Sequence, residues 1–162
     1  KGLVIDVNQA LNGEGPFSPE RSGSLPVIDV IKACFSGKYT QDDLNKMVVG
    51  KGGFVAYLGT NDALEIENRI KAGDKEAEFY ELAMAYQIAK EIGAASTVLE
   101  GKVDAILLTG GLAYGKLFVE NITSRIKHLA PVYSFPGEDE MNALAFNVLL
   151  MLKGEIPLKE YN

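Results

Sequence analysis

The clearest fold signal in the sequence is the segment Val103-Asp104-Ala105-Ile106-Leu107-Leu108-Thr109-Gly110-Gly111-Leu112. Residues 103–108 are apolar apart from Asp104, which is typical of a strand buried on both faces of a sheet. Two glycines follow at once, and apolar residues at helical spacing then run over residues 112–127. The segment therefore predicts a strand, a tight turn and a helix, which together form the repeating unit of an α/β fold.

Similar units are expected on both sides of this segment. β-branched and apolar runs predict strands at residues 3–7 and 132–135, and a strand or extended segment at residues 54–58. Helices are predicted by apolar spacing and by capping residues, with starts at Ser24, at Thr40 with Asp43, and within Gly59-Thr60-Asn61-Asp62. The predicted helical ranges are 24–35, 40–50, 62–70, 74–92 and 138–152. We expect the helices at 74–92 and 138–152 to bury the core of one domain.

Composition narrows the class of protein. The chain has 162 residues, of which 47% are hydrophobic and 23% are charged, as expected for one globular domain. A formal net charge of -6 argues against nucleic acid as a partner, since a protein surface that binds nucleic acid is normally basic. With a single cysteine, no signal peptide pattern and no apolar run of roughly 20 residues, the sequence predicts a cytoplasmic protein without a membrane span.

The glycine turn at Gly110-Gly111 is the first candidate for chemistry. A buried strand that ends in glycines at a helix start lets the backbone approach an anion closely, with free N–H groups and the positive end of the helix dipole facing it. A nucleotide phosphate fits such a turn. The alternative is a turn whose glycines serve packing alone, since two glycines are a weaker signal than a complete phosphate-binding fingerprint.

The loop at residues 13–23 is the second candidate. It holds a single arginine, Arg21, in a stretch whose prolines limit its freedom. A guanidinium fixed in this way forms planar, bidentate pairs with phosphate or carboxylate groups. The alternative is a surface arginine that pairs with Glu20 or Glu14 and contributes little.

Two further segments place polar groups at helix starts. Gly59-Thr60-Asn61-Asp62 offers small side chains for a ribose, a phosphate or a metal-bound water, although helix capping alone also explains them. Glu138, Asp139 and Glu140 supply the oxygen ligands that Mg²⁺ prefers. Carboxylates at a helix N-terminus need no metal to explain them, so this alternative also stays open.

Several long segments, taken together and in order, resemble the butyrate kinases of the acetokinase family. They include Gly13-Glu14-Gly15-Pro16-Phe17-Ser18-Pro19-Glu20-Arg21-Ser22-Gly23 and Leu108-Thr109-Gly110-Gly111-Leu112-Ala113-Tyr114. The other matching ranges are 6–12, 50–53, 56–62, 83–94 and 133–141. The resemblance covers essentially the whole chain. It implies an actin-like ATPase (ribonuclease H-like) domain with a mixed sheet flanked by helices, and reversible, ATP-dependent phosphorylation of butyrate to butyryl phosphate.

The resemblance also implies roles for single residues. Arg21 is implied to lie at the reacting phosphoryl group. The nucleotide, ATP or ADP, is implied to contact two sets of residues: Gly110, Gly111, Leu112 and Ala113, and Gly59, Thr60, Asn61 and Asp62. One of the three acids at 138–140 is implied to aid Mg²⁺ binding, and we expect Glu140. Acetate kinases carry an aromatic residue and an arginine where this chain has Ala63 and Leu64, so no adenine contact carries over at those positions.

The resemblance further implies a domain organisation. Residues 1–162 are expected to form the C-terminal nucleotide-binding domain of a two-domain enzyme that forms homo-oligomers, with the N-terminal domain absent. That domain supplies a glycine-rich phosphate hairpin, a catalytic aspartate and the walls of the carboxylate pocket, so this chain alone is expected to be inactive. Two other hypotheses remain: a kinase for acetate or branched-chain carboxylates, and a non-catalytic nucleotide-binding module of the actin and Hsp70 type. Arg21 argues against the second, since a clamp needs no cation at the phosphoryl group.

Overall fold

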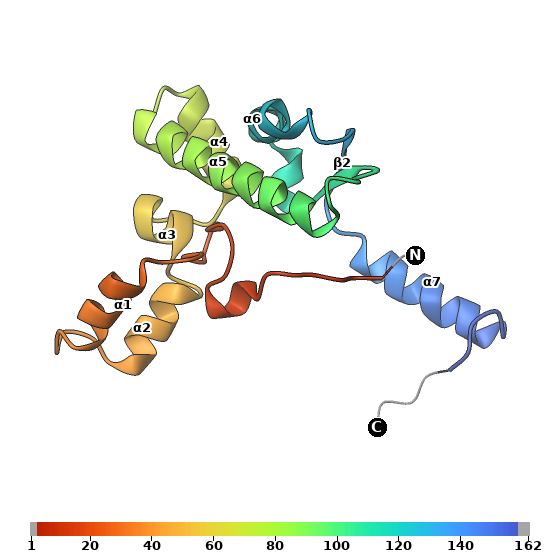
Figure 1. Cartoon of the computed structure of the whole chain (residues 1–162), viewed down its shortest axis with the longest axis horizontal. Helices are drawn as coiled ribbons and strands as arrows, with labels where there is room; N and C mark the ends of the chain where they lie inside the picture. Colours follow the sequence, from red (N-terminus) through yellow and green to blue (C-terminus); the bar gives the residue numbers. More distant parts are fainter. Residues whose placement is uncertain (1–2, 159–162) are drawn as a thin grey trace.

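The structure, a computed structural model, describes residues 3–158. Helices dominate these residues, and a small parallel sheet lies near the C-terminal end (Figure 1). The elements are η1 (Ala10–Asn12), α1 (Val27–Cys34), α2 (Gln41–Val48), α3 (Gly53–Leu58), α4 (Ala63–Lys71), α5 (Lys75–Val98), β1 (Ile106–Gly110), η2 (Gly111–Tyr114), α6 (Lys116–Ile126), β2 (Val132–Pro136) and α7 (Glu140–Leu152). No helix among the described residues is long and apolar enough to cross a lipid bilayer.

Helix starts agree with the sequence where a side chain caps them. Thr40 and Asp43 form the predicted capping box at α2, and Asp62 accepts hydrogen bonds from the first turn of α4. The expected cap at Ser24 is wrong, because α1 starts only after Pro26 and has no side-chain cap. Ser24 Oγ instead accepts a hydrogen bond from the Gly15 N–H at 3.1 Å, which draws it into the preceding loop.

Two strand predictions near the N-terminus are wrong. Residues 3–7 form no regular element, and their apolar side chains are exposed. A strand needs the hydrogen bonds of a neighbouring strand, and none lies beside this segment among the described residues. Residues 54–58 belong to helix α3, in which Phe54 is buried and Gly59 ends the helix in a left-handed conformation. A short apolar run does not distinguish a strand from a buried helical turn.

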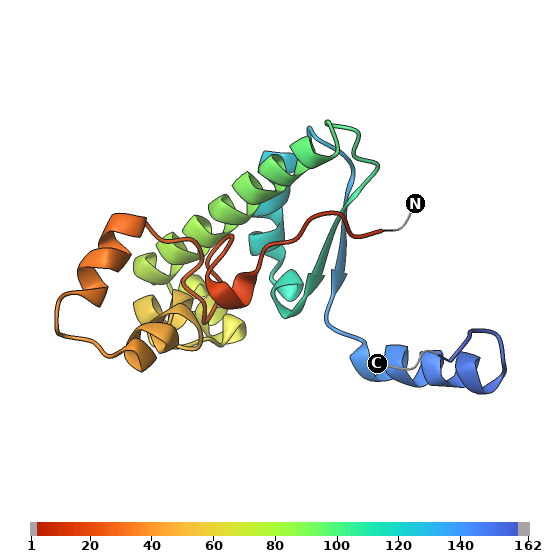
Figure 2. The ribbon, with the colours of Figure 1, turned by 60° about the horizontal axis from the view of Figure 1, so that its bottom comes forward.

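Helices α5 and α6 form the centre of the core, together with β1. The sequence offered Gly93 or Gly101 as the end of the predicted 74–92 helix. α5 continues through Gly93, where no neighbouring atom approaches closely, to Val98, so Gly93 does not end it. Its Met84 and Ala85 are fully buried, and α6 contributes Phe118, Ile122 and Ile126. Figure 2 shows α6 lying along α5, with the two strands beside them. The predicted role of the 74–92 helix, α5, in the core is confirmed.

The sheet consists of β1 and β2, paired in parallel with Ile106 opposite Val132 and Gly110 opposite Pro136. β1 begins later than predicted, and the expectation that it is buried on both faces is wrong. Ile106 is buried, whereas Leu107 on the other face is 63% exposed. The apolar run therefore predicts the strand correctly, but it does not predict that one face of the strand is exposed. The helix predicted at 112–127 is also divided, since Gly115 separates η2 from α6.

Helix α7 does not contribute to the core. None of its residues is buried, and Figures 1 and 2 both show it lying apart from the other helices. Its apolar side chains are exposed, with Met141 at 81%. The prediction that the 138–152 helix buries the core is therefore wrong, because a strongly apolar helix indicates burial but does not say against which surface.

Candidate functional site

The loop that carries Arg21 is anchored by Phe17. This side chain is buried and meets the ring of Phe54 edge-on at 6.0 Å between centroids, and that of Tyr57 at 5.9 Å. The Phe17 N–H donates a hydrogen bond to Gln87 Oε1 on α5 at 3.1 Å. The loop is thus fixed to both α3 and α5, which restricts the position of the arginine that follows.

The backbone on either side of Arg21 is also held. Gly50 N–H donates to the Glu20 carbonyl at 2.8 Å, Ser22 N–H donates to the Val48 carbonyl at 2.9 Å, and Arg21 itself forms a β-bridge with Val49. Such backbone pairing positions the Cα of Arg21 without using its side chain. The guanidinium therefore remains available for a ligand.

Gly52 and Gly53 make this close approach possible. A Cβ atom on Gly53 would overlap the carbonyl oxygen of Ser18, and a Cβ on Gly52 would overlap the backbone N of Ser22. Gly53 also has a positive φ of 54°, which side chains rarely adopt. From the sequence, residues 50–53 were expected to end a helix and were one of the segments that resemble the family, without a structural role for the glycines. Their structural role is to let the Arg21 loop pack against the start of α3.

The Arg21 side chain has no ionic partner in the described part of the chain. Its Nε is buried without a hydrogen bond, and none of the ion pairs among residues 3–158 includes it. The acids considered as partners are used elsewhere: Glu20 accepts from Asn61 Nδ2 at 3.1 Å, and Glu14 accepts from the Gln9 N–H at 2.6 Å. An unpaired buried donor is costly, so an anion at this position would be stabilised.

The segment 59–62 lies beside this loop through the contact of Asn61 with Glu20. Asp62 Oδ1 accepts from the N–H groups of Leu64 at 2.9 Å and Glu65 at 3.2 Å. Thr60 Oγ1 donates to Glu65 Oε2 at 2.9 Å. The side chains of Thr60 and Asp62 thus carry out the capping that the sequence allowed as an alternative. Because capping already explains these two side chains, their contribution to nucleotide binding stays a prediction.

The glycine turn differs from the expected pattern in one detail. Gly110 has φ 85° and ψ 178°, a conformation essentially limited to glycine. Its N–H donates to the Gly137 carbonyl at 3.2 Å, so the expectation of a free N–H at Gly110 is wrong. The N–H of Gly111, at the start of η2, has no acceptor among residues 3–158, and no atom lies within 4 Å of a Cβ placed on Gly111. The open side of the turn is therefore at Gly111.

Of the three acids at 138–140, Glu138 lies at the glycine turn. Its Oε1 is 3.8 Å from a Cβ placed on Gly110. Asp139 accepts a hydrogen bond from Asn142 Nδ2 at 2.6 Å, and Glu140 begins α7. Among the described residues, no group of three or more histidine, cysteine, aspartate or glutamate side chains is arranged to hold a metal. The metal role of Glu140 stays a prediction.

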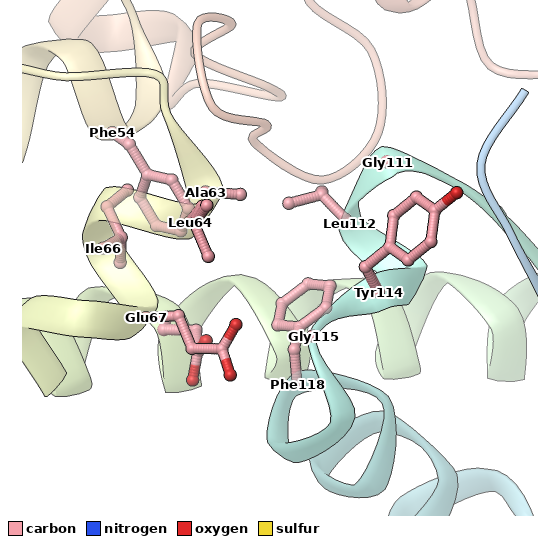
Figure 3. Close-up of a pocket in the computed structure, with 11 residues that line it drawn as sticks. Phe54, Ala63, Leu64, Ile66, Glu67, Gly111, Leu112, Tyr114, Gly115 and Phe118 are labelled. Atoms are coloured by element: carbon pink, nitrogen blue, oxygen red, sulfur yellow. The ribbon is translucent and has the colours of Figure 1, made fainter. Parts of the chain in front are cut away.

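A cavity of about 330 Å³ opens beside the turn. Figure 3 shows its walls, which come from the start of α4 and from η2 and α6. Most of the lining is apolar: Phe54, Ala63, Leu64, Ile66, Leu112 and Phe118. The polar side chains that line it are Glu67, Glu81 and Tyr114. The cavity brings Ala63 and Leu64 together with Gly111, which the sequence analysis did not foresee.

Solved structures with the same fold include three kinases. The matches are to acetate kinase of Entamoeba histolytica (TM-score 0.71, 16% identity, 86% of this chain and 43% of that chain), acetate kinase of Porphyromonas gingivalis (0.70, 19%, 85% and 41%), and a propionate kinase from Francisella tularensis subsp. tularensis SCHU S4 (0.67, 20%, 79% and 39%). The chain thus has the fold of the actin-like ATPases, and the predicted fold class is confirmed.

The acetokinase family matches this chain over residues 14–145, and the chain belongs to that family. Butyrate kinase 2 of Clostridium acetobutylicum is 54% identical to it over 160 residues, which are 99% of this chain and 45% of that protein. The chain therefore spans about half the length of the curated relative that it matches. The family resemblance seen in the sequence is confirmed.

Proposed function

We propose that this chain is the C-terminal, nucleotide-binding domain of a two-domain enzyme that phosphorylates butyrate with ATP, reversibly, to give butyryl phosphate and ADP. The observation that carries the proposal is the 54% identity, over 99% of the chain, to a protein named butyrate kinase 2. The anchored and unpaired Arg21 supports a catalytic function over a purely nucleotide-binding one.

In this proposal, the substrate carboxylate attacks the γ-phosphorus of ATP in line with the leaving ADP oxygen. Such a reaction depends on positioning and on neutralising charge, since the protein itself forms no covalent bond. Arg21 offers a planar cation to the transferring phosphoryl group. Because hydrogen bonds on either side hold its backbone in place, less conformational entropy is lost when the phosphoryl group binds. The other half of the site, including the carboxylate pocket, is assigned to the remaining part of the longer enzyme.

The nucleotide is assigned to the turn at Gly110-Gly111 with Leu112 and Ala113, and to the segment Gly59-Thr60-Asn61-Asp62. The unpaired N–H of Gly111 suits a phosphate oxygen. A Mg²⁺ ion held near the turn would neutralise charge on the phosphates. Because Mg²⁺ keeps several waters and uses one or two carboxylates, the absence of a three-ligand cluster among residues 3–158 is compatible with it. We assign Glu140 to this role, with Glu138 as the alternative that lies next to Gly110.

The test is acyl phosphate formation by the complete protein, with ATP, Mg²⁺ and a panel of acetate, butyrate and branched-chain carboxylates. We expect the highest kcat/KM for butyrate. A higher kcat/KM for acetate or for a branched-chain acid would mean that this acid, and not butyrate, is the substrate. ADP binding without acyl phosphate from any carboxylate would favour the non-catalytic module instead.

A further inference from the structure

Glu81 is an unusual residue in this core. It lies on α5 between the buried positions Ala77 and Met84, and only 8% of its surface is exposed. No hydrogen bond or ion pair to its carboxyl is found among residues 3–158. Its oxygens keep some access to solvent, since among the described residues the buried side-chain polar atom without a partner is Arg21 Nε. A carboxyl in such a deeply placed side chain still loses much of the water that solvates its charge.

Glu81 lines the cavity beside the glycine turn. Glu67 from α4 lines the same cavity (Figure 3). The two acids differ in their surroundings. Glu67 pairs with Lys71 Nζ at 2.8 Å, whereas Glu81 has no such cation. Burial raises the pKa of the Glu81 carboxyl, and the charges of Glu67 and Glu78 raise it further. Glu81 therefore keeps its proton to a higher pH than an ordinary glutamate, and a protonated carboxyl has both a donor and an acceptor.

The lining of the cavity is mostly apolar with a few polar groups, which suits a partly polar ring. Leu64 and Leu112 supply apolar walls, and Gly111 lies at the rim. Its volume of about 330 Å³ lies within the range of small-ligand pockets. If nucleotide phosphates bind at Gly111, as in the proposed function, the base of the same nucleotide can enter this cavity. A purine buried there needs polar partners for its edge, and Glu81 is the most buried polar group available.

We propose that Glu81 is the residue that selects adenine in this cavity, donating its carboxylic O–H to N1 of the base and accepting a hydrogen bond from the N6 amine. The proposal rests on the proposed nucleotide site at Gly111. Guanine presents a donor at N1 and an acceptor at O6. The O–H of Glu81 would therefore face the N1 donor, and its carbonyl oxygen would face the O6 acceptor. Buried polar groups left unpaired in this way are the strongest basis for rejecting a close analogue. The site is thus expected to prefer ATP and ADP over GTP and GDP.

The test compares the affinities of ADP and GDP by calorimetry in the complete protein. In the wild type we expect ADP to bind roughly tenfold more tightly than GDP or better, as for a hydrogen-bonded pair. The preference should decline as the pH rises through the raised pKa of Glu81, because the proton that N1 accepts is then lost. The other ionisable groups near Glu81 are Glu67 with Lys71, Glu78 with Lys75, and Tyr114.

Two variants separate recognition from a structural role. Glu81→Gln retains a donor and an acceptor without ionising, so it should keep the preference for ADP at every pH. Glu81→Leu should bind ADP and GDP alike. Glu76→Gln is the matched control, since it removes an exposed carboxylate from the same helix, outside the cavity and not among the charges that act on Glu81, and it should keep the ADP preference.

The outcomes distinguish this proposal from the proposed function. A wild type that makes butyryl phosphate, together with a Glu81→Leu variant that still prefers ADP, would overturn the role of Glu81 alone. If Glu81→Leu does not fold, Glu81→Gln decides, because loss of the ADP preference in that folded variant would equally overturn it. A wild type that binds neither nucleotide would overturn the nucleotide site and this inference together.

Discussion

Arg21 is positioned by its backbone, and its guanidinium has no partner within the described part of the chain. In the complete enzyme we predict that Arg21→Ala lowers kcat by about two orders of magnitude, because a cation that acts in the transition state is lost. ADP affinity should change little. Arg125→Ala, which removes an exposed arginine from α6, is the control for the loss of charge. Unchanged butyryl phosphate formation in Arg21→Ala would remove this residue from the site.

Gly111 offers a cleaner test of the glycine turn than Gly110. A side chain at Gly110 would be strained by the positive φ whether or not a ligand binds, so folding and binding effects could not be separated. Gly111 has an ordinary backbone conformation and open space around it. We predict that Gly111→Val leaves the thermal unfolding midpoint nearly unchanged. ADP binding should weaken roughly tenfold, because the new side chain would keep a phosphate oxygen from the Gly111 N–H and so remove one charged hydrogen bond.

The control for this variant is Gly93→Ala in α5, which also has open space around it and lies outside the cavity. Equal ADP affinity in folded Gly111→Val and in the wild type would mean that the turn serves packing alone.

Single residues were predicted from the sequence only where the neighbouring chain determines them. The loop around Arg21 was found through its resemblance to a family, but its lack of an ionic partner depends on where Glu20 and Glu14 find theirs. Glu81 was not predicted at all. A glutamate between apolar helix positions is normally read as solvent-exposed, and only the packing of α4 and α6 around α5 buries it.

At the scale of elements, the packing of the Arg21 loop on α3 suggests a second test of catalysis. We predict that Gly53→Ala lowers kcat more than it raises the Kd for ADP, because the new Cβ would displace Ser18 and the loop that follows. Gly73→Ala is the matched control: it has the same unfavourable positive φ just after α4, outside the assigned site, and no atom lies within 4 Å. Both variants should lose some stability.

If Gly53→Ala and Gly73→Ala reduced kcat equally, backbone strain at a positive φ would explain the loss, and the loop position would not. If Gly53→Ala does not fold, Gly52→Ala provides a second probe, since its Cβ would overlap the backbone of Ser22 without a positive φ.

Elements with local signals were predicted well, whereas those that depend on distant partners were not. The caps predicted at Thr40 and within residues 59–62 lie within a few residues of the groups they bind. Both are confirmed, the second at Asp62. The predicted strands at 3–7 and 54–58 are wrong, because pairing in a sheet depends on a neighbour that the local sequence does not reveal. The same limit explains why β1 was predicted but its exposed face was not.

For the whole molecule, the core rests on α5, α6 and β1, while α7 buries nothing. The prediction of a self-contained core thus holds for the 74–92 helix and fails for the 138–152 helix. Phe54 and Met84 are among the most buried side chains, which places the Arg21 loop and the cavity on the same packed unit. We therefore expect this unit to unfold cooperatively in the isolated chain.

The isolated chain should nevertheless have no carboxylate kinase activity. Phosphoryl transfer needs groups on both sides of the nucleotide and a site closed to water. The groups assigned here, Arg21 and the turn at Gly110-Gly111, cover one side, and the chain spans 45% of the butyrate kinase 2 that it matches.

The most direct measurement is butyryl phosphate formation from butyrate, ATP and Mg²⁺ by the 162-residue chain and by the complete protein, assayed side by side. A cooperative thermal transition would first establish that the isolated chain is folded. We predict robust turnover by the complete protein and none by the folded chain alone. Turnover by the isolated chain would show that it holds a complete active site, and no turnover by the complete protein would contradict the assignment as a butyrate kinase.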